Sequence, residues 1–151
     1  METITLDANV IVSAFDRNDE LRETCRELID MIREGMYPVF SPTIFYPEIA
    51  SGLRKASPAP ELIKQFMREI RQLLFVRPVT IDERLAREAE RIAIEYRQRG
   101  ADSVYAATAK RYRAIVITND INIAHVSTIR VMTPVEAHAH LTYLNSLAED
   151  D

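Results

Sequence analysis

The sequence has few of the residues on which several common chemistries depend. Among 151 residues it has one cysteine, three glycines and no tryptophan. The single cysteine, Cys25, excludes an intramolecular disulfide framework and a cysteine-based zinc site, which fits a reducing compartment, and we expect it to pack in the core. With only Gly35, Gly52 and Gly100, the chain has no Walker-type or dinucleotide-type phosphate loop and no nucleophile elbow.

Long apolar runs are also missing. No run approaches the roughly 18 residues that a membrane span requires. The first residues, METITLDANVIVSAF, carry acids at positions 2 and 7 and no basic region, so they do not resemble a secretory signal. We therefore expect a soluble, cytoplasmic protein.

The charge balance is slightly acidic. There are 23 acidic and 19 basic residues, a formal net charge of −4, which excludes a generally basic nucleic-acid coat but allows a local basic patch. A length of 151 residues with 47% hydrophobic residues is sufficient for one core, so we expect a single domain over residues 1–151.

Short apolar runs alternate with longer amphipathic segments. We predict strands at residues 4–6, 39–40, 75–79, 114–117 and 129–132. Helices are predicted at residues 8–15, 21–34, from 41–43 toward 53, 61–74, from 82 to 99–100, from 102 onward and 133–144. Pro78 places the third strand at a sheet edge, and residues 57–60 form a turn within the domain. Such alternation predicts an α/β fold with a parallel sheet covered on both faces, which binds ligands at the carboxyl ends of its strands.

Four carboxylates lie at the ends of these elements. Asp7 and Asp120 follow predicted strands, and Glu48 and Asp102 lie near helix starts. Two carboxylates about 4 Å apart repel by roughly 4 kcal/mol at an effective dielectric near 20, and a divalent cation removes that cost. Oxygen-only ligands favour Mg²⁺ or Mn²⁺, which supports hydrolysis of phosphodiesters. The alternative is that these acids only cap helices.

Two other carboxylate enzyme classes fit less well. A haloacid-type phosphatase needs a second aspartate two residues after the first, where this chain has Asn9. A receiver domain needs an acidic pair near its first strand and a lysine after its last, and Met132, Thr133 and Pro134 provide no lysine.

Four segments that contain these acids resemble the acidic blocks of the PIN-domain ribonucleases, in order and in spacing. Among these, the chain looks most like the VapC-type toxins of toxin–antitoxin pairs. The resemblance extends from about residue 4 to residue 134. The segments are ITLDANV, PEI, ADSVYAATA and VITND, starting at residues 4, 47, 101 and 116.

The resemblance implies a three-layer α/β/α sandwich with a mostly parallel central sheet and endonucleolytic cleavage of RNA that depends on Mg²⁺ or Mn²⁺. It also implies a cognate antitoxin and a homodimer. Asn122 and Ile123 stand where many members have an acid and an aromatic residue, which weakens the case for a second metal. A housekeeping RNA-processing or DNA-flap nuclease and a non-catalytic binding module remain alternatives. The residues that match the family's metal-binding and catalytic acids are Asp7, Glu48, Asp102 and Asp120, with Thr118 in support.

Other polar residues allow two interpretations. Asn9 could orient Asp7 or form a turn. Tyr46 and Tyr105 could stack on a base, although core or edge packing is the expectation. His138 and His140 point away from each other on a helix, and His125 is interpreted as structural. Seven basic residues could hold the phosphate backbone or form solvated helix faces: Arg54, Lys55, Arg97, Arg99, Lys110, Arg111 and Arg113.

Overall fold

In the computed structural model, which describes residues 1–57, 59–72 and 75–150, each of the first three strands is followed by two helices, and each of the last two is followed by one. The strands are β1 (Ile4–Leu6), β2 (Val39–Pro42), β3 (Val76–Val79), β4 (Ile115–Ile117) and β5 (Arg130–Met132). The helices are α1 (Ala8–Phe15), α2 (Arg22–Glu34), α3 (Phe45–Ala56), α4 (Pro60–Gln72), α5 (Glu83–Tyr96), α6 (Gly100–Tyr112), the 3₁₀ helix η1 (Ile121–His125) and α7 (Pro134–Glu149).

All five strands belong to one parallel sheet with the order β3-β2-β1-β4-β5. The predicted parallel sheet is confirmed, and β3, which contains Pro78, lies at its edge as expected. From the central strand β1, the chain adds β2 and then β3 on one side, and afterwards adds β4 and then β5 on the other side. The switch point therefore lies between β1 and β4, where parallel sheets place their ligand sites.

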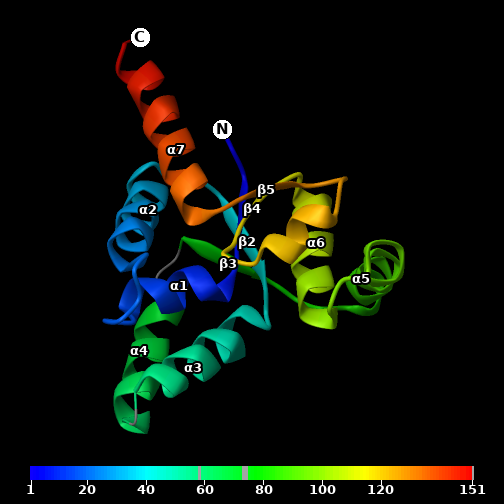
Figure 1. Cartoon of the computed structure of the whole chain (residues 1–151), viewed down its shortest axis with the longest axis horizontal. Helices are drawn as coiled ribbons and strands as arrows, with labels where there is room; N and C mark the ends of the chain where they lie inside the picture. Colours follow the sequence, from blue (N-terminus) through cyan, green and yellow to red (C-terminus); the bar gives the residue numbers. More distant parts are fainter. Residues whose placement is uncertain (58, 73–74, 151) are drawn as a thin grey trace.

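The helices cover both faces of the sheet. One core packs side chains of α1, α2, α3, α4 and α7 against the sheet, and the other packs α5 and α6 against its opposite face. Figure 1 shows the strands between α1, α2 and α7 on one side and α5 and α6 on the other. The expected three-layer α/β/α sandwich is thus the observed fold, and Cys25 is fully buried in the first core, as predicted.

Strand β2 is longer than predicted, and this delays the next helix. We expected a helix start at residues 41–43, but Ser41 and Pro42 belong to β2 and α3 begins at Phe45. The Ser41 side chain explains the difference. Its Oγ accepts from the Leu6 amide at 3.1 Å and donates to the Leu6 carbonyl at 2.8 Å, which ties β2 to β1.

The turn between α5 and α6 also differs from the prediction. Helix α5 was expected to continue to Arg99 and Gly100, but it ends at Tyr96, and Arg97 caps it with a left-handed backbone at φ 54°. Helix α6 then begins at Gly100, two residues before Asp102. The predictions for Pro58 and for residues 73–74 lie outside the described residues.

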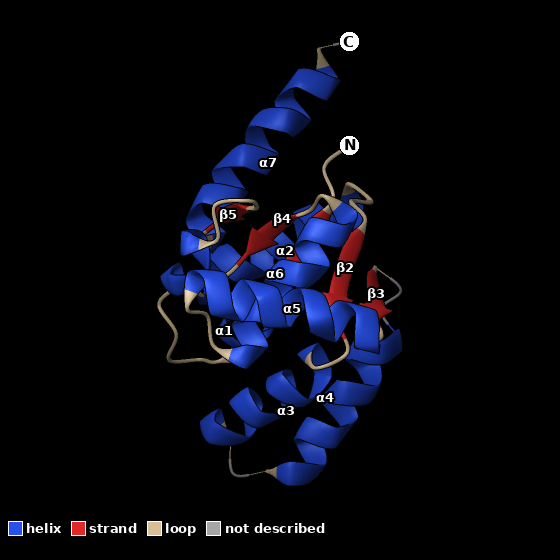
Figure 2. Ribbon diagram, turned by 90° about the vertical axis from the view of Figure 1, so that its right-hand side faces the viewer, coloured by secondary structure: helices blue, strands red, loops and turns tan. Residues whose placement is uncertain are grey.

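Helix α7 begins as predicted and ends later than predicted. The Thr133 hydroxyl accepts from the Glu136 amide at 3.2 Å, with Pro134 in the first turn. The helix continues past Leu144 to Glu149 and projects from the rest of the molecule (Figure 2). Among the described residues, no helix combines the length and the apolar character that crossing a membrane would require.

Candidate active site

The pairing of β1 with β4 brings Asp7 and Thr118 together. Leu6 lies opposite Ile117 in the sheet, so the next residue of each strand emerges at the same carboxyl edge. The Thr118 hydroxyl donates to Asp7 Oδ2 at 2.7 Å. Asp7 is 8% exposed and Thr118 only 1%, so this hydrogen bond is largely shielded from water. The switch point of the sheet thus holds a fixed carboxylate.

Asn9 connects the two strand ends. Its Nδ2 donates to Asp7 Oδ2 at 3.3 Å and to Thr118 Oγ1 at 3.2 Å, and its Oδ1 accepts from the Asn119 amide at 3.3 Å. Asp7 is also the N-cap of α1, accepting from the Asn9 amide at 3.4 Å. Orientation of the acid by Asn9 and capping of the helix by the acid are therefore compatible.

Glu48 approaches Asp7 from α3. One turn later, Gly52 packs so closely on α1 that an added Cβ would lie 2.6 Å from Val12 Cγ2. Residues four apart share one helix face, so this contact also turns Glu48 toward α1. Its Oε1 accepts from the Tyr105 hydroxyl at 2.7 Å. Tyr105 is 1% exposed, which confirms the expectation of core packing.

Arg99 joins the other two acids. Its Nε donates to Asp102 Oδ2 at 3.1 Å, and its Nη2 donates to Asp120 Oδ2 at 2.6 Å. The Asp120 amide in turn donates to the Thr118 hydroxyl at 2.9 Å, which links this pair to Asp7. The Arg99 side chain is 75% exposed, whereas those of Asp102 and Asp120 are 11% and 18% exposed. A solvent-exposed guanidinium group thus lies over two shielded carboxylates.

The electrostatics of the site agree with this geometry. The pKa of Asp7 is raised to about 6, mainly by burial; hydrogen bonds from Thr118 and Asn9 act to lower it, and the nearby charges of Glu48 and Asp102 act to raise it. Burial also raises the pKa of Asp102, against the lowering effect of Arg99. Since Asp7 responds to both Glu48 and Asp102, all four predicted acids belong to one electrostatic cluster made of two pairs.

The donor set of this cluster suits a hard divalent cation. It consists of carboxylate oxygens, and Mg²⁺ commonly binds through one or two carboxylates while keeping several waters. Within the described ranges, no three His, Cys, Asp or Glu side chains are arranged so that they could hold one ion as they stand. By their chemistry the residues fit Mg²⁺ or Mn²⁺, and Arg99 supplies positive charge at Asp102 and Asp120.

The other candidates from the sequence are dispersed. Arg54 donates to the Ser57 carbonyl at 3.1 Å on the surface. His138 and His140 contact different acids, Glu27 at 2.8 Å and Glu2 at 3.2 Å, consistent with their predicted divergence. None of these contacts involves the four acids.

Two features of the site escaped the sequence analysis. Arg99 was considered as a phosphate-binding residue or as part of a solvated helix face, and its contacts with Asp102 and Asp120 were not predicted. Its spacing of three residues from Asp102 is one at which helical side chains meet. The Tyr105–Glu48 hydrogen bond joins residues 57 positions apart and has no local signal in the sequence.

Comparison with solved structures supports the fold. The chain is 24% identical to FitAcB from Neisseria gonorrhoeae, with a TM-score of 0.68 and coverage of 88% of this chain and 99% of that one. It is 21% identical to a toxin–antitoxin complex from Klebsiella pneumoniae, with a TM-score of 0.65 and coverage of 87% and 98%. It is 15% identical to VapC20 from Mycobacterium tuberculosis, described as a sarcin-ricin loop cleaving toxin, with a TM-score of 0.65 and coverage of 81% of this chain and 93% of that one.

Comparison of the sequence with protein families gives one result that covers most of the chain. No curated protein sequence matches. Residues 4–129 match the PIN domain, and this range includes Asp7, Glu48, Asp102, Thr118 and Asp120. This match, together with the parallel sheet and its carboxylates at the switch point, shows that the chain belongs to the PIN domain family.

Proposed function

We propose that this protein is a divalent-metal-dependent endoribonuclease that hydrolyses phosphodiester bonds in RNA with a single domain. The observation that carries the proposal is the gathering of Asp7, Glu48, Asp102 and Asp120 at the switch point of a PIN-domain sheet. Buried like charges repel, so such a cluster is costly unless cations offset it. A purely structural role would not require four acids at one place.

Two of the four acids, Asp7 and Glu48, have partners that would position them for this reaction. Thr118 and Asn9 hold Asp7 Oδ2, and Tyr105 holds Glu48 Oε1. The free carboxylate oxygens can then accept hydrogen bonds from the attacking water and orient it toward the phosphorus. Bound at Asp7, Glu48, Asp102 and Asp120, Mg²⁺ or Mn²⁺ would supply an acidified water and neutralise charge on the phosphate.

We further propose that the protein is the toxin of a toxin–antitoxin pair and forms a homodimer in the cytoplasm. The similar proteins from K. pneumoniae and M. tuberculosis are described as a toxin–antitoxin complex and as a toxin. An apolar surface between α1, α2 and α4 supports a protein partner. Two cavities of about 460 and 530 Å³ lie there. Phe15, which is 42% exposed, lines both, and Leu62, which is 61% exposed, lines the larger one.

Cleavage of RNA by the purified chain tests the catalytic proposal. The assay compares the intact protein, Asp7→Asn and Arg54→Ala, each with Mg²⁺, with Mn²⁺ and with a chelator. We expect metal-dependent cleavage that falls by about 100-fold or more in Asp7→Asn. Arg54→Ala should retain cleavage, because the Arg54 side chain donates to the Ser57 carbonyl and, among the described residues, forms no hydrogen bond or ion pair with the four acids. Cleavage in the presence of chelator, or full activity of Asp7→Asn, would contradict the mechanism.

The same assay, together with the neighbouring genes, separates the alternatives. A non-catalytic binding module would bind RNA and cut none under any metal condition. A housekeeping nuclease would cut RNA but would have no inhibitory partner encoded beside it. A short gene immediately upstream whose product blocks cleavage would favour the toxin.

A further inference from the structure

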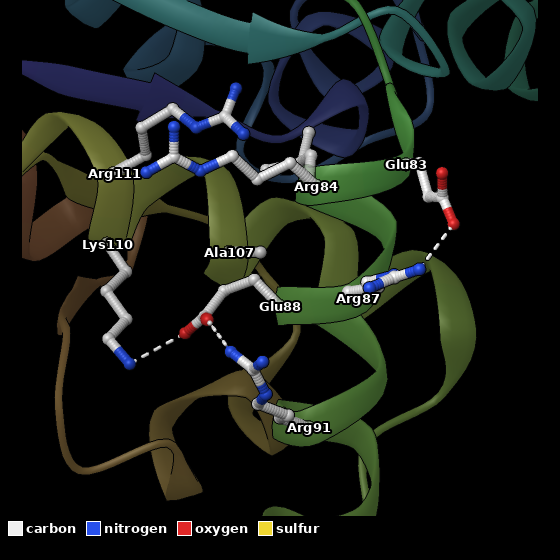
Figure 3. A pocket seen from close by; sticks show the side chains of 9 residues that line it. Glu83, Arg84, Arg87, Glu88, Arg91, Ala107, Lys110 and Arg111 are labelled. Carbon is white, nitrogen blue, oxygen red and sulfur yellow. Dashed lines mark hydrogen bonds and ion pairs between the residues drawn. The ribbon is translucent and has the colours of Figure 1, made fainter.

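A basic groove lies between α5 and α6, apart from the acid cluster. It encloses about 740 Å³, and its lining includes five cationic and two anionic side chains. The lining therefore carries three net positive charges, in a chain whose net charge is −4. Figure 3 shows these side chains, which project from both helices. Such local segregation of positive charge is the pattern by which an acidic protein can hold an anion.

Each anionic side chain of the groove is paired with a cation of the same groove. Glu88 accepts from Lys110 through Oε1 at 2.7 Å and from Arg91 through Oε2 at 3.1 Å (Figure 3). Glu83 accepts from Arg87 at 2.7 Å. These contacts leave no carboxylate in the lining for the remaining cations.

Arg84 and Arg111 are the cations that remain. Among the described residues, Arg84 forms no ion pair, and Arg111 reaches only Asp82, at 3.6 Å. That carboxylate already caps α5 by accepting from the Leu85 amide at 2.8 Å. Both side chains line the same cavity and are labelled in Figure 3. Two available guanidinium groups match the planar, bidentate geometry with which arginine binds phosphate.

Helix α6 connects this groove to the acid cluster. Asp102 lies in its first turn and Arg111 near its last, about 14 Å apart along the helix axis. Ala107, between them, has no long side chain to fill the groove. An extended polyanion could therefore contact one end of the helix with one phosphate and the groove with another.

We propose that the groove between α5 and α6 binds backbone phosphates of single-stranded RNA, with Arg84 and Arg111 as the principal contacts. The identity of this ligand rests on the proposed ribonuclease function, since the groove by itself specifies only phosphate. The groove would contact RNA phosphates other than the one that is cleaved.

Fluorescence anisotropy with a labelled single-stranded RNA of about 12 nucleotides tests this site. Asp7→Asn serves as the background, so that the RNA stays intact in the presence of Mg²⁺. The double variant Arg84→Ala/Arg111→Ala should weaken binding about 10-fold and reduce the slope of log affinity against log salt by about 1.4. Arg33→Ala/Arg68→Ala is the matched control, because Arg33 also has a partner at 3.6 Å, Asp30. We expect it to bind RNA normally.

The double variant Arg84→Lys/Arg111→Lys shows whether the alanine variant binds RNA weakly because of lost charge or because it is misfolded. It keeps both charges, so it should recover most of the salt slope and part of the affinity. Equal binding by the alanine variant and its control would overturn the proposal. The proposal would also be overturned if NMR showed inorganic phosphate bound in the groove while the alanine variant kept its full affinity for RNA. The proposed function is judged separately, by whether the intact chain cleaves RNA, so either proposal can fail while the other stands.

Discussion

At the scale of single residues, Asp7 shows how burial and neighbouring carboxylates together oppose the ionisation of an acid in this site. Its folded pKa of about 6 lies above its ordinary value of 3.8, so the native state holds the Asp7 proton more tightly than the unfolded chain does. The stabilisation from this proton is complete below about pH 4 and is lost as pH rises through 6, and it corresponds to about 3 kcal/mol. Ionisation of Asp7 thus lowers the stability of the folded protein, and a bound cation can offset this loss.

Asp7→Asn should therefore stabilise the metal-free protein at pH 7.5 by up to about 3 kcal/mol and change little at pH 4. Asparagine keeps an oxygen for Thr118 and caps helices as well as aspartate does. Urea unfolding with a chelator at both pH values measures the effect, with the exposed Asp30→Asn as control. A variant less stable than the parent at pH 7.5 would show that Asp7 contributes mainly through its hydrogen bonds.

Arg99 is the second residue whose environment predicts a measurable effect. Its guanidinium binds Asp102 and Asp120, so a metal ion bound at the proposed site would have to displace it or share these carboxylates with it. In Arg99→Ala that competition is removed, and the Mg²⁺ or Mn²⁺ concentration that half-saturates thermal stabilisation should fall about 3-fold to 10-fold. Arg68→Ala controls for loss of one surface charge. Weaker metal stabilisation in Arg99→Ala would instead make Arg99 a support of the metal site.

At the scale of elements, the contact of α1 with α3 positions Glu48. Gly52 leaves no room for a methyl group beside the stiff, branched side chain of Val12. Gly52→Ala should push the helices apart, destabilise the fold by about 1–3 kcal/mol and reduce RNA cleavage as Glu48 moves. Urea unfolding and the cleavage assay measure the two effects.

Two further variants make this test specific. Adding Val12→Ala to Gly52→Ala opens the space again and should restore much of the stability and cleavage. Gly100→Ala is the control for stability, because its added Cβ would have no neighbour within 4 Å. If Gly52→Ala were as stable and as active as the parent, the close helix contact would not be what places Glu48.

At the scale of the whole molecule, the surfaces divide into an acid cluster at the switch point, a basic groove on α5 and α6, and an apolar surface on α1, α2 and α4. A protein partner on the apolar surface would leave the groove free. The molecule could then bind RNA and an inhibitor through different faces.

Leu62→Glu should therefore weaken binding of the product of an adjacent upstream gene about 10-fold or more, and leave metal-dependent cleavage unchanged. Leu62 is 61% exposed, so the charge should not disturb folding. Ile94→Glu, exposed by 76% on α5, is the matched control. Calorimetry with the co-purified partner gives the affinities, and light scattering gives the oligomeric state. Unchanged binding by Leu62→Glu would assign the partner to another surface.

The sequence by itself determined the α/β alternation, the parallel sheet, the edge position of β3 and the placement of Asp7 and Asp120 after buried strands. These follow from local periodicity and proline chemistry, which act between near neighbours in the chain. Only the tertiary structure decided that Leu6 pairs with Ile117, that Gly52 meets Val12 and that Arg99 reaches Asp120. Sheet register and helix approach depend on side chains far apart in sequence, whose packing no local pattern specifies.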